Sequence, residues 1–270
     1  MIRALTRAFK SEWLKLRRPG MILGGLGAMI GFSILAIVLN LTRLDSATVA
    51  GPGGRATAGL TAAQVAASTG FATLTSISAT FLGVVALAVC AIAVGMEYSN
   101  GTLRNLLVRE PGRLRLLGGK LLALASFVTL GVVLAYGAAL VTALILVPTH
   151  DISTAAWFTS DGVQSMLKGA GNLLLATLVW GALGAILALI LRSTAPALSI
   201  GLVYILVVEQ VILLAWSDGA KWLPGQLISA IAQGGTSVIP YGNALLLVGT
   251  FIVAALIAAG AFFRQRDVAA

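Results

Sequence analysis

Long apolar stretches divide the chain into six segments, and each is long enough to cross a membrane. They cover about residues 20–41, 71–96, 116–147, 169–191, 195–215 and 244–263. A helix needs about 20 residues to cross a hydrocarbon core of ~30 Å. The stretches are continuous rather than alternating, and backbone groups in lipid must be paired within the segment, so helices are predicted rather than barrel strands. The pattern predicts an all-α integral membrane protein with six transmembrane helices.

Composition and charge fix the orientation of these segments. The chain is 59% hydrophobic and 10% charged, which excludes a soluble globular domain. Segments 1–19, 97–120, 192–194 and 264–270 hold 14 of the 18 Lys and Arg residues. All four fall on one side of a six-span protein, and basic residues are retained on the cytoplasmic side. We therefore expect a multi-pass cell-membrane protein with both termini in the cytoplasm, whose net charge of +9 reflects topology rather than nucleic-acid binding.

The polar segments define the remaining organisation. Residues 1–19 are predicted to form a cytoplasmic amphipathic elbow helix in the membrane interface, with one apolar arc and a basic face. Pro19-Gly20 breaks it before the six-span domain of 20–263, and 264–270 form a cytoplasmic tail. The alternative is a generic basic anchor. The candidate interfacial residues of the elbow are Glu12, Trp13, Lys15, Arg17 and Arg18.

The segment between the second and third spans, residues 97–120, has a pattern of its own. Ser99 or Asn100 can cap a short helix with an apolar face, and Pro111 ends it. Basic residues flank that face, and Lys120 belongs to a basic collar at the start of the next span. The pattern favours a docking helix for a cytoplasmic protein. The alternative is a re-entry turn whose charges only fix topology.

One acid lies well inside a span. Glu209 falls in the fifth apolar stretch, where a charged group needs a partner or a water-filled path. It could attract a cationic substrate, carry a proton, or accept hydrogen bonds from the backbone of the following loop. In that loop, Gln226–Ala232 is too short to cross and is predicted to be a re-entrant helix. Leu60–Ala67 is either a short outer helix or an ordinary loop.

The same segments resemble a known family. Glu97, the run Gly101-Thr102-Leu103-Arg104, Leu107 and Pro111 resemble the loop between the second and third spans of ABC-2 type permeases, the membrane subunits of ABC transporters. The stretch from Ser11 to Arg18 resembles that family's N-terminal segment. The resemblance implies that the loop is a coupling helix seated on an ATPase subunit. The coupling residues would be Glu97, Gly101, Thr102, Leu103, Arg104, Leu107 and Arg109.

The resemblance also implies partners and a function. It implies an ATP-driven exporter in which two permease copies, or two similar permeases, form the path and separate subunits bind ATP and Mg. The chain has no catalytic, cofactor or metal site of its own that sequence reveals, so we expect it not to be an enzyme. Membrane lipid is a further partner, nucleic acid is not, and the cargo would be an antimicrobial peptide, a drug or a lipid.

Two other functions stay open at this point. A membrane sensor or scaffold could use the same loop to recruit a cytoplasmic protein without moving any cargo. An ion-coupled carrier could instead be centred on Glu209.

Overall fold

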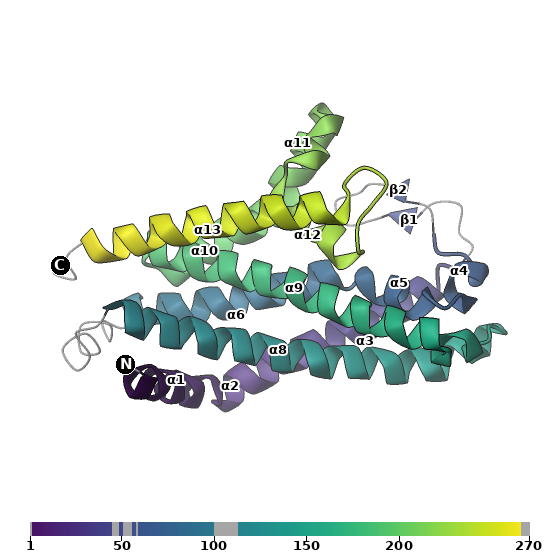
Figure 1. Ribbon diagram of the computed structural model, residues 1–270, viewed down its shortest axis with the longest axis horizontal. Helices are drawn as coiled ribbons and strands as arrows, with labels where there is room; N and C mark the ends of the chain where they lie inside the picture. The colour runs from purple at the N-terminus through teal and green to yellow at the C-terminus, as the bar shows by residue number, and fades with distance from the viewer. Residues whose placement is uncertain (1, 45–48, 51–55, 58, 100–112, 266–270) are drawn as a thin grey trace.

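The computed structural model describes residues 2–44, 49–50, 56–57, 59–99 and 113–265. Within them, six helices are long and apolar enough to cross a membrane, as predicted: Pro19–Leu41, Ala79–Ser99, Leu117–His150, Ser160–Leu191, Thr194–Ala215 and Tyr241–Gly260. Apart from the last part of the fifth span, they lie side by side as an elongated bundle (Figure 1). The chain is a helical membrane protein apart from a small two-stranded ladder, β1 (Val49–Ala50) with β2 (Ala56–Thr57).

Two helices form the centre of the bundle. Helix α6 (Ala79–Ser99) and helix α9 (Ser160–Leu191) are the most buried spans, and α13 (Tyr241–Gln265) is the least buried. Gly184 of α9 faces the backbone of α6, because a Cβ added there would lie 2.9 Å from the Leu87 carbonyl carbon. Small residues at such positions let two membrane helices approach closely. The α6–α9 pair therefore forms the closely packed centre of the bundle.

The second span differs from its predicted range of 71–96. A turn at residues 77–78 interrupts the helix, so α5 (Gly70–Ser76) is a separate short helix and the span begins at Ala79. Hydroxyl groups explain the break: Thr75 donates to the Phe71 carbonyl, Ser76 to the Thr73 carbonyl and Ser78 to the Thr75 carbonyl. Such bonds to backbone acceptors compete with the regular helical pattern and bend helices. The fourth span also starts nine residues before the predicted position 169, where Thr159 accepts a hydrogen bond from the Gly162 N–H.

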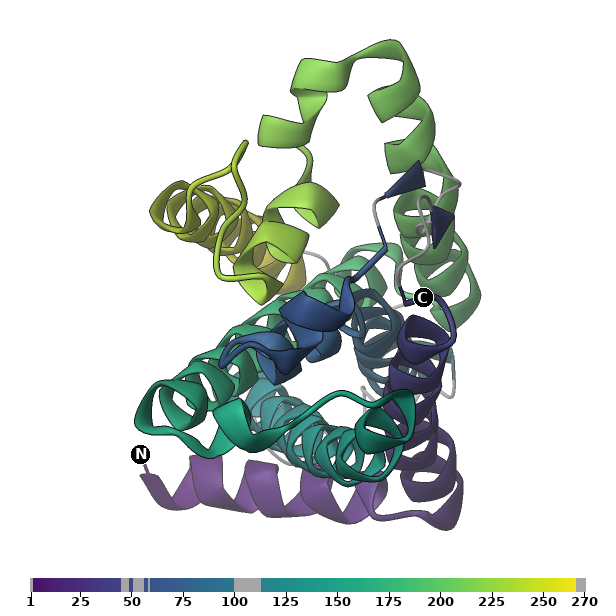
Figure 2. The same ribbon diagram turned by 90° about the vertical axis from the view of Figure 1, so that its right-hand side faces the viewer.

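Helix α1 (Ile2–Leu16) crosses one end of the bundle, as Figure 2 shows along the bundle axis. It packs mainly on α8 (Arg113–Leu146), the third span. Pro19 opens helix α2 (Pro19–Met21), where a missing N–H is tolerated. The first span continues through a π-helical turn, η1 (Ile22–Leu26), into α3 (Gly27–Leu41). The predicted N-terminal helix and its break are present.

At the other end of the bundle, short elements cover a second apolar core. They are α4 (Ala62–Ala66), η2 (Val147–His150) and η3 (Ala155–Phe158). Trp157 is fully buried and donates its indole N–H to the Val65 carbonyl at 2.8 Å. Thr61 and Gln64 form a capping box at the start of α4. Of the two alternatives left open for Leu60–Ala67, the structure has the short helix, over Ala62–Ala66.

The fifth span is interrupted. Helix α10 (Thr194–Val203) passes through a π-helical segment, η4 (Tyr204–Val208), into α11 (Glu209–Ala215), which projects away from the bundle (Figure 1). The chain returns through η5 (Ser217–Lys221) to α12 (Pro224–Ala232), a nine-residue helix packed on α9 and α13. The short helix predicted at 226–232 is therefore present, two residues longer at its start.

Candidate functional site

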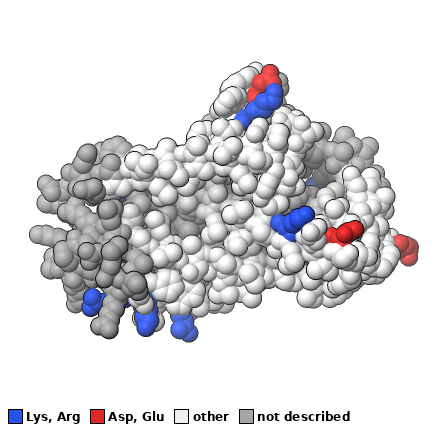
Figure 3. Space-filling model, in the orientation of Figure 1, with Lys and Arg blue, Asp and Glu red and all other residues white. Residues whose placement is uncertain are grey.

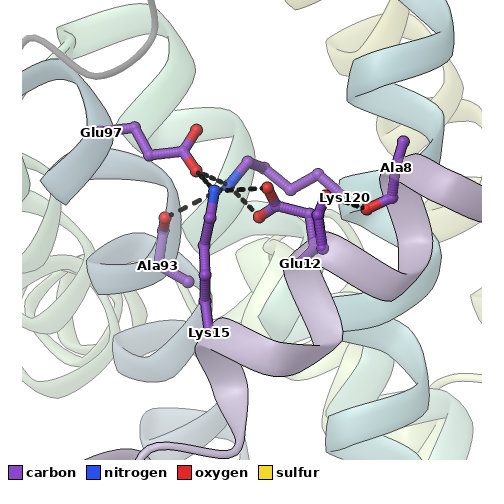
Figure 4. A network of polar contacts seen from close by, with 7 residues as sticks. Ala8, Glu12, Lys15, Ala93, Glu97 and Lys120 are labelled. Atoms are coloured by element: carbon purple, nitrogen blue, oxygen red, sulfur yellow. Dashed lines mark hydrogen bonds and ion pairs between the residues drawn. The ribbon is translucent and has the colours of Figure 1, made fainter. Parts of the chain in front are cut away.

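Four charged residues meet where α1, α6 and α8 come together at one end of the bundle. Glu12 and Lys15 come from α1, Glu97 from the last turn of α6, and Lys120 from an early turn of α8. Figure 4 shows their side chains pointing toward one another. We call these four residues the charge cluster. It joins elements that lie up to 108 positions apart in the chain.

The charges of the cluster alternate. Lys15 Nζ lies 2.6 Å from a Glu12 carboxylate oxygen and 2.7 Å from Glu97 Oε1. Lys120 Nζ lies 2.7 Å from the other Glu12 oxygen and 2.7 Å from Glu97 Oε1. It also donates to the Ala93 carbonyl of α6 at 3.4 Å. Each ammonium group therefore contacts both carboxylates, and each carboxylate contacts both ammonium groups.

Burial makes these contacts matter energetically. The side chains of Glu12, Glu97 and Lys120 are only 5%, 8% and 6% exposed, whereas Lys15 is 37% exposed. Exposed ion pairs contribute at most about 1 kcal/mol, but removing one partner of a buried pair costs about 3–5 kcal/mol. The exposed pair of Lys221 and Asp218, at 3.2 Å, belongs to the first kind. The charge cluster belongs to the second kind.

The electrostatics of the α1 residues agree with this. Burial alone would raise the pKa of the Glu12 carboxyl, but attraction and hydrogen bonding from Lys120, and then from Lys15, outweigh it and leave the pKa below its ordinary value. Burial alone would lower the pKa of Lys15, but hydrogen bonds and attraction from Glu12 and Glu97 raise it above its ordinary value. Both groups are therefore charged at neutral pH.

Apolar contacts bring α1 close enough to α8 for the cluster to form. A Cβ added at Gly119 would lie 2.6 Å from the Ala8 Cβ, so only a glycine fits between the helices there. Trp13 stacks on Phe9, with ring centroids 6.0 Å apart, and meets the edge of Phe127 of α8 at 6.5 Å. The apolar side of α1 thus packs on a span.

The predicted coupling residues fall into two groups. Glu97 is described and belongs to the charge cluster. Gly101, Thr102, Leu103, Arg104, Leu107 and Arg109 lie outside the described residues, as does the predicted helix around them. Of the predicted elbow residues, Glu12 and Lys15 are in the cluster, Trp13 packs beside it, and Arg17 and Arg18 are exposed.

The carboxylate of Glu209, the first residue of α11, reaches the start of α12. Glu209 is only 2% exposed, and its Oε1 accepts the backbone N–H of Gln226 at 2.8 Å. Leu223, the residue before α12, supplies no side-chain cap. A carboxylate from another element therefore caps this helix, where the backbone N–H groups carry partial positive charge. This is the arrangement expected if Glu209 accepts hydrogen bonds from the following loop.

The sequence analysis named Glu12 and Lys15 as elbow residues and Glu97 as a coupling residue, but placed Lys120 only in a basic collar. It did not bring the four together. A signal was present: Glu12 is the first acid of the chain, and Glu97 ends an otherwise uncharged span on the basic side. Isolated acids among basic residues at a membrane boundary suggest pairing. Sequence spacing could not show that the pairing crosses from α1 to α6 and α8.

The surface agrees with a membrane-embedded bundle. Figure 3 shows a face that is uncharged over its middle, with Lys and Arg near the end where α1 lies and other charges toward the opposite end and on the projecting turn. In the described part of the chain, no three His, Cys, Asp or Glu residues are grouped so that they could hold a metal ion.

Comparison with known proteins agrees with this arrangement. A search of curated proteins finds no match to the chain. The family model described as "ABC-2 family transporter protein" matches residues 8–208, which extend from α1 through the charge cluster to the fifth span. Proteins of this family are membrane components of transporters that associate with an ABC ATPase subunit. With a match over most of its length and six membrane-spanning helices, the chain belongs to the ABC-2 family of transporter proteins.

Proposed function

We propose that this chain is the membrane-spanning subunit of an ATP-driven exporter, that two copies or two similar permeases form the path, and that separate ATPase subunits supply the energy. The observation that carries the proposal is the family match over residues 8–208 on a six-span bundle. The end of the bundle that holds α1 and the charge cluster would face the cytoplasm and the ATPase. The opposite end, with α4, η2 and η3, would face outward.

The charge distribution supports this orientation. In the sequence, 14 of the 18 Lys and Arg residues lie in segments that a six-span topology puts on the same side as the N-terminus, and basic residues are retained on the cytoplasmic side. The α1 helix crosses the bundle end, as expected of an elbow helix in the membrane interface (Figure 2). The α12 helix lies between the fifth and sixth spans and is too short to cross a membrane, as expected of a re-entrant segment.

The projecting α11 supports a dimer. Its main contacts are with its neighbours η4 and η5. It exposes Val211 and Leu214 to 57% and 84%, and Trp216, the residue after it, is 51% exposed. Within one copy, the described residues leave these three apolar side chains exposed. A second copy of the permease would cover them near the path that the two copies enclose. The cargo would be an apolar or amphipathic molecule such as an antimicrobial peptide, a drug or a lipid.

The ion-coupled alternative is disfavoured by the position of Glu209. A carboxylate that accepts the Gln226 N–H is already in use as a helix cap. The sensor or scaffold alternative predicts the same membrane bundle and the same cytoplasmic partner, so function must separate it from transport.

The test is ATP hydrolysis by the complex of this chain with its ATPase in proteoliposomes. A transporter is expected to show turnover that rises with candidate cargo, and Arg104→Glu is expected to abolish that rise while the complex still assembles. A complex that hydrolyses ATP at the same rate with and without every cargo tried, and that moves none of them, would favour the scaffold.

A further inference from the structure

We propose that the charge cluster fastens α1 to the ends of α6 and α8, so that α1 moves together with these two span ends during each cycle of ATP hydrolysis. Glu12, Lys15, Glu97 and Lys120 would thus be positioning residues for the coupling step. The movement during ATP hydrolysis rests on the proposed function. The fastening itself is a property of this chain and can be tested without an ATPase.

The position of the cluster in the chain gives the first argument. Glu97 lies two residues before the end of α6, and Lys120 lies seven residues after the start of α8. Residues 100–112, which include most of the predicted coupling residues, are therefore joined on both sides to helices that carry a member of the cluster. A force on either helix end acts on a side chain that contacts Glu12 of α1 directly or through one neighbour.

The alternation of charge gives the second argument. With two carboxylates and two ammonium groups the cluster is neutral, and every member contacts two opposite charges. Removing one member leaves an uncompensated charge in a buried place, which is far less favourable than losing an exposed pair. The cluster therefore holds as a set. Elements joined in this way move together or separate, rather than shifting gradually.

The packing around the cluster gives the third argument. The contacts of Trp13 with Phe9 and Phe127 bring α1 near α8, but apolar contacts alone allow a helix to roll or slide by a turn. Buried polar groups are best established as devices that fix one register among several. Lys15 lies on α1 itself, so Lys120 of α8 is the partner of Glu12 whose contact depends on where α1 sits. The cluster thus fixes where α1 sits on the bundle.

The fastening is tested by hydrogen exchange on the full chain in lipid nanodiscs. Lys120→Met removes one buried charge, and Lys221→Met removes the matching charge from the exposed pair with Asp218. We expect amides of residues 6–16 to exchange about tenfold faster or more in Lys120→Met and to remain unchanged in Lys221→Met. Unchanged exchange in Lys120→Met, or equal acceleration in both variants, would overturn the proposal.

A second variant guards against general loss of fold. The double variant Glu12→Gln/Lys120→Met removes one acid and one base, and it leaves the pair of Lys15 with Glu97 at 2.7 Å. No net buried charge remains, so exchange in residues 6–16 is expected to return partway toward that of the unmodified chain. The effects of Glu12→Gln and Lys120→Met on exchange are also measured separately. If the effect of the double variant equals the sum of these two effects, the four charges do not act as a set and the proposal fails.

The joint movement is tested in the complex with the ATPase. Cys90, the only cysteine of the chain, is replaced by Ala, and spin labels are placed at Lys10→Cys on α1 and Leu122→Cys on α8, both exposed positions. We expect one distance, the same with and without vanadate-trapped nucleotide, for the native cluster. With Lys120→Met we expect a second distance in the trapped state while hydrolysis continues. A single unchanged distance in Lys120→Met would refute the role of the cluster in the joint movement, and a second distance with the native cluster would refute the joint movement itself.

The two arms separate the failure of this proposal from failure of the proposed function. If no ATPase associates with the chain, no trapped state forms and the proposed function is wrong, whereas hydrogen exchange still decides whether the cluster fastens α1. If the ATPase associates and Lys120→Met leaves both exchange and distance unchanged, the proposed function stands and the fastening is wrong.

Discussion

Removing the carboxylate of Glu209 should loosen the start of α12 without abolishing transport. Glu209 Oε1 accepts the Gln226 N–H at 2.8 Å, and the carboxylate is almost fully buried. In Glu209→Leu this N–H loses its acceptor where water does not readily replace it. In Glu209→Gln an amide oxygen of similar shape remains and only the charge is lost.

The magnitude follows from that one bond. A hydrogen bond to a charged group contributes about 1.5–3 kcal/mol, and each 1.4 kcal/mol changes an equilibrium tenfold. Glu209→Leu should therefore speed hydrogen exchange at the start of α12 about 10- to 100-fold, and Glu209→Gln should have a smaller effect. The later residues Ile228 and Ile231 are buried, so the rest of the helix should respond less.

Hydrogen exchange over residues 224–232 measures the loosening, and cargo movement by the reconstituted complex measures function. If Glu209→Leu leaves exchange unchanged, the carboxylate does not stabilise α12 and the cap is refuted. If Glu209→Gln abolishes transport while α12 remains protected, the charge itself is needed for transport. That result would favour the ion-coupled carrier over the structural role of Glu209.

Three further predictions follow from the packing and the charges. Gly184→Ala should lower the free energy of unfolding by about 1–3 kcal/mol, because the new Cβ meets the α6 backbone. Gly171→Ala, on the same helix, meets nothing within 4 Å and should raise the free energy of unfolding by up to about 1 kcal/mol. Thermal unfolding of the two variants in one detergent compares them. Gly119→Ala should separate α1 from α8 although all four cluster charges remain, and faster hydrogen exchange in residues 6–16 would show it. The docking of α1 should be independent of pH between 4.5 and 10.5, the ordinary pKa values of Glu and Lys. It should weaken below that range as acid protonates Glu12 at its lowered pKa, and above it as alkali deprotonates Lys15 at its raised pKa. The distance between labels at Lys10→Cys and Leu122→Cys measures the docking. An acid loss that begins near pH 6 would contradict the assigned contacts.

The sequence predicted the spans because a membrane selects strongly for continuous apolar length, and all six are present. It misplaced the start of the second span because hydropathy does not register hydroxyl groups such as those of Thr75 and Ser78, which bond to the backbone and break the helix. It also did not predict the π-helical interruption before Glu209, because hydropathy does not distinguish an α-helical from a π-helical turn.

The candidate site was predicted only in part. Polar residues at membrane boundaries were recognised one by one, because burying a charge near lipid is costly and therefore rare. Their assembly depends on Gly119, which lets α1 approach α8, and on the crossing angle of α1. Neither can be inferred from spacing along a single chain. The predicted role of residues 101–109 stays a prediction, since they lie outside the described residues.

The central claim is that a separate ATPase drives this permease. The most direct measurement is to solubilise the tagged chain gently from its native membrane and identify what accompanies it. We expect a subunit with a phosphate-binding loop in a fixed ratio to the permease, and ATP hydrolysis by the purified complex. Recovery of the intact, folded chain with no such subunit and no hydrolysis would contradict it.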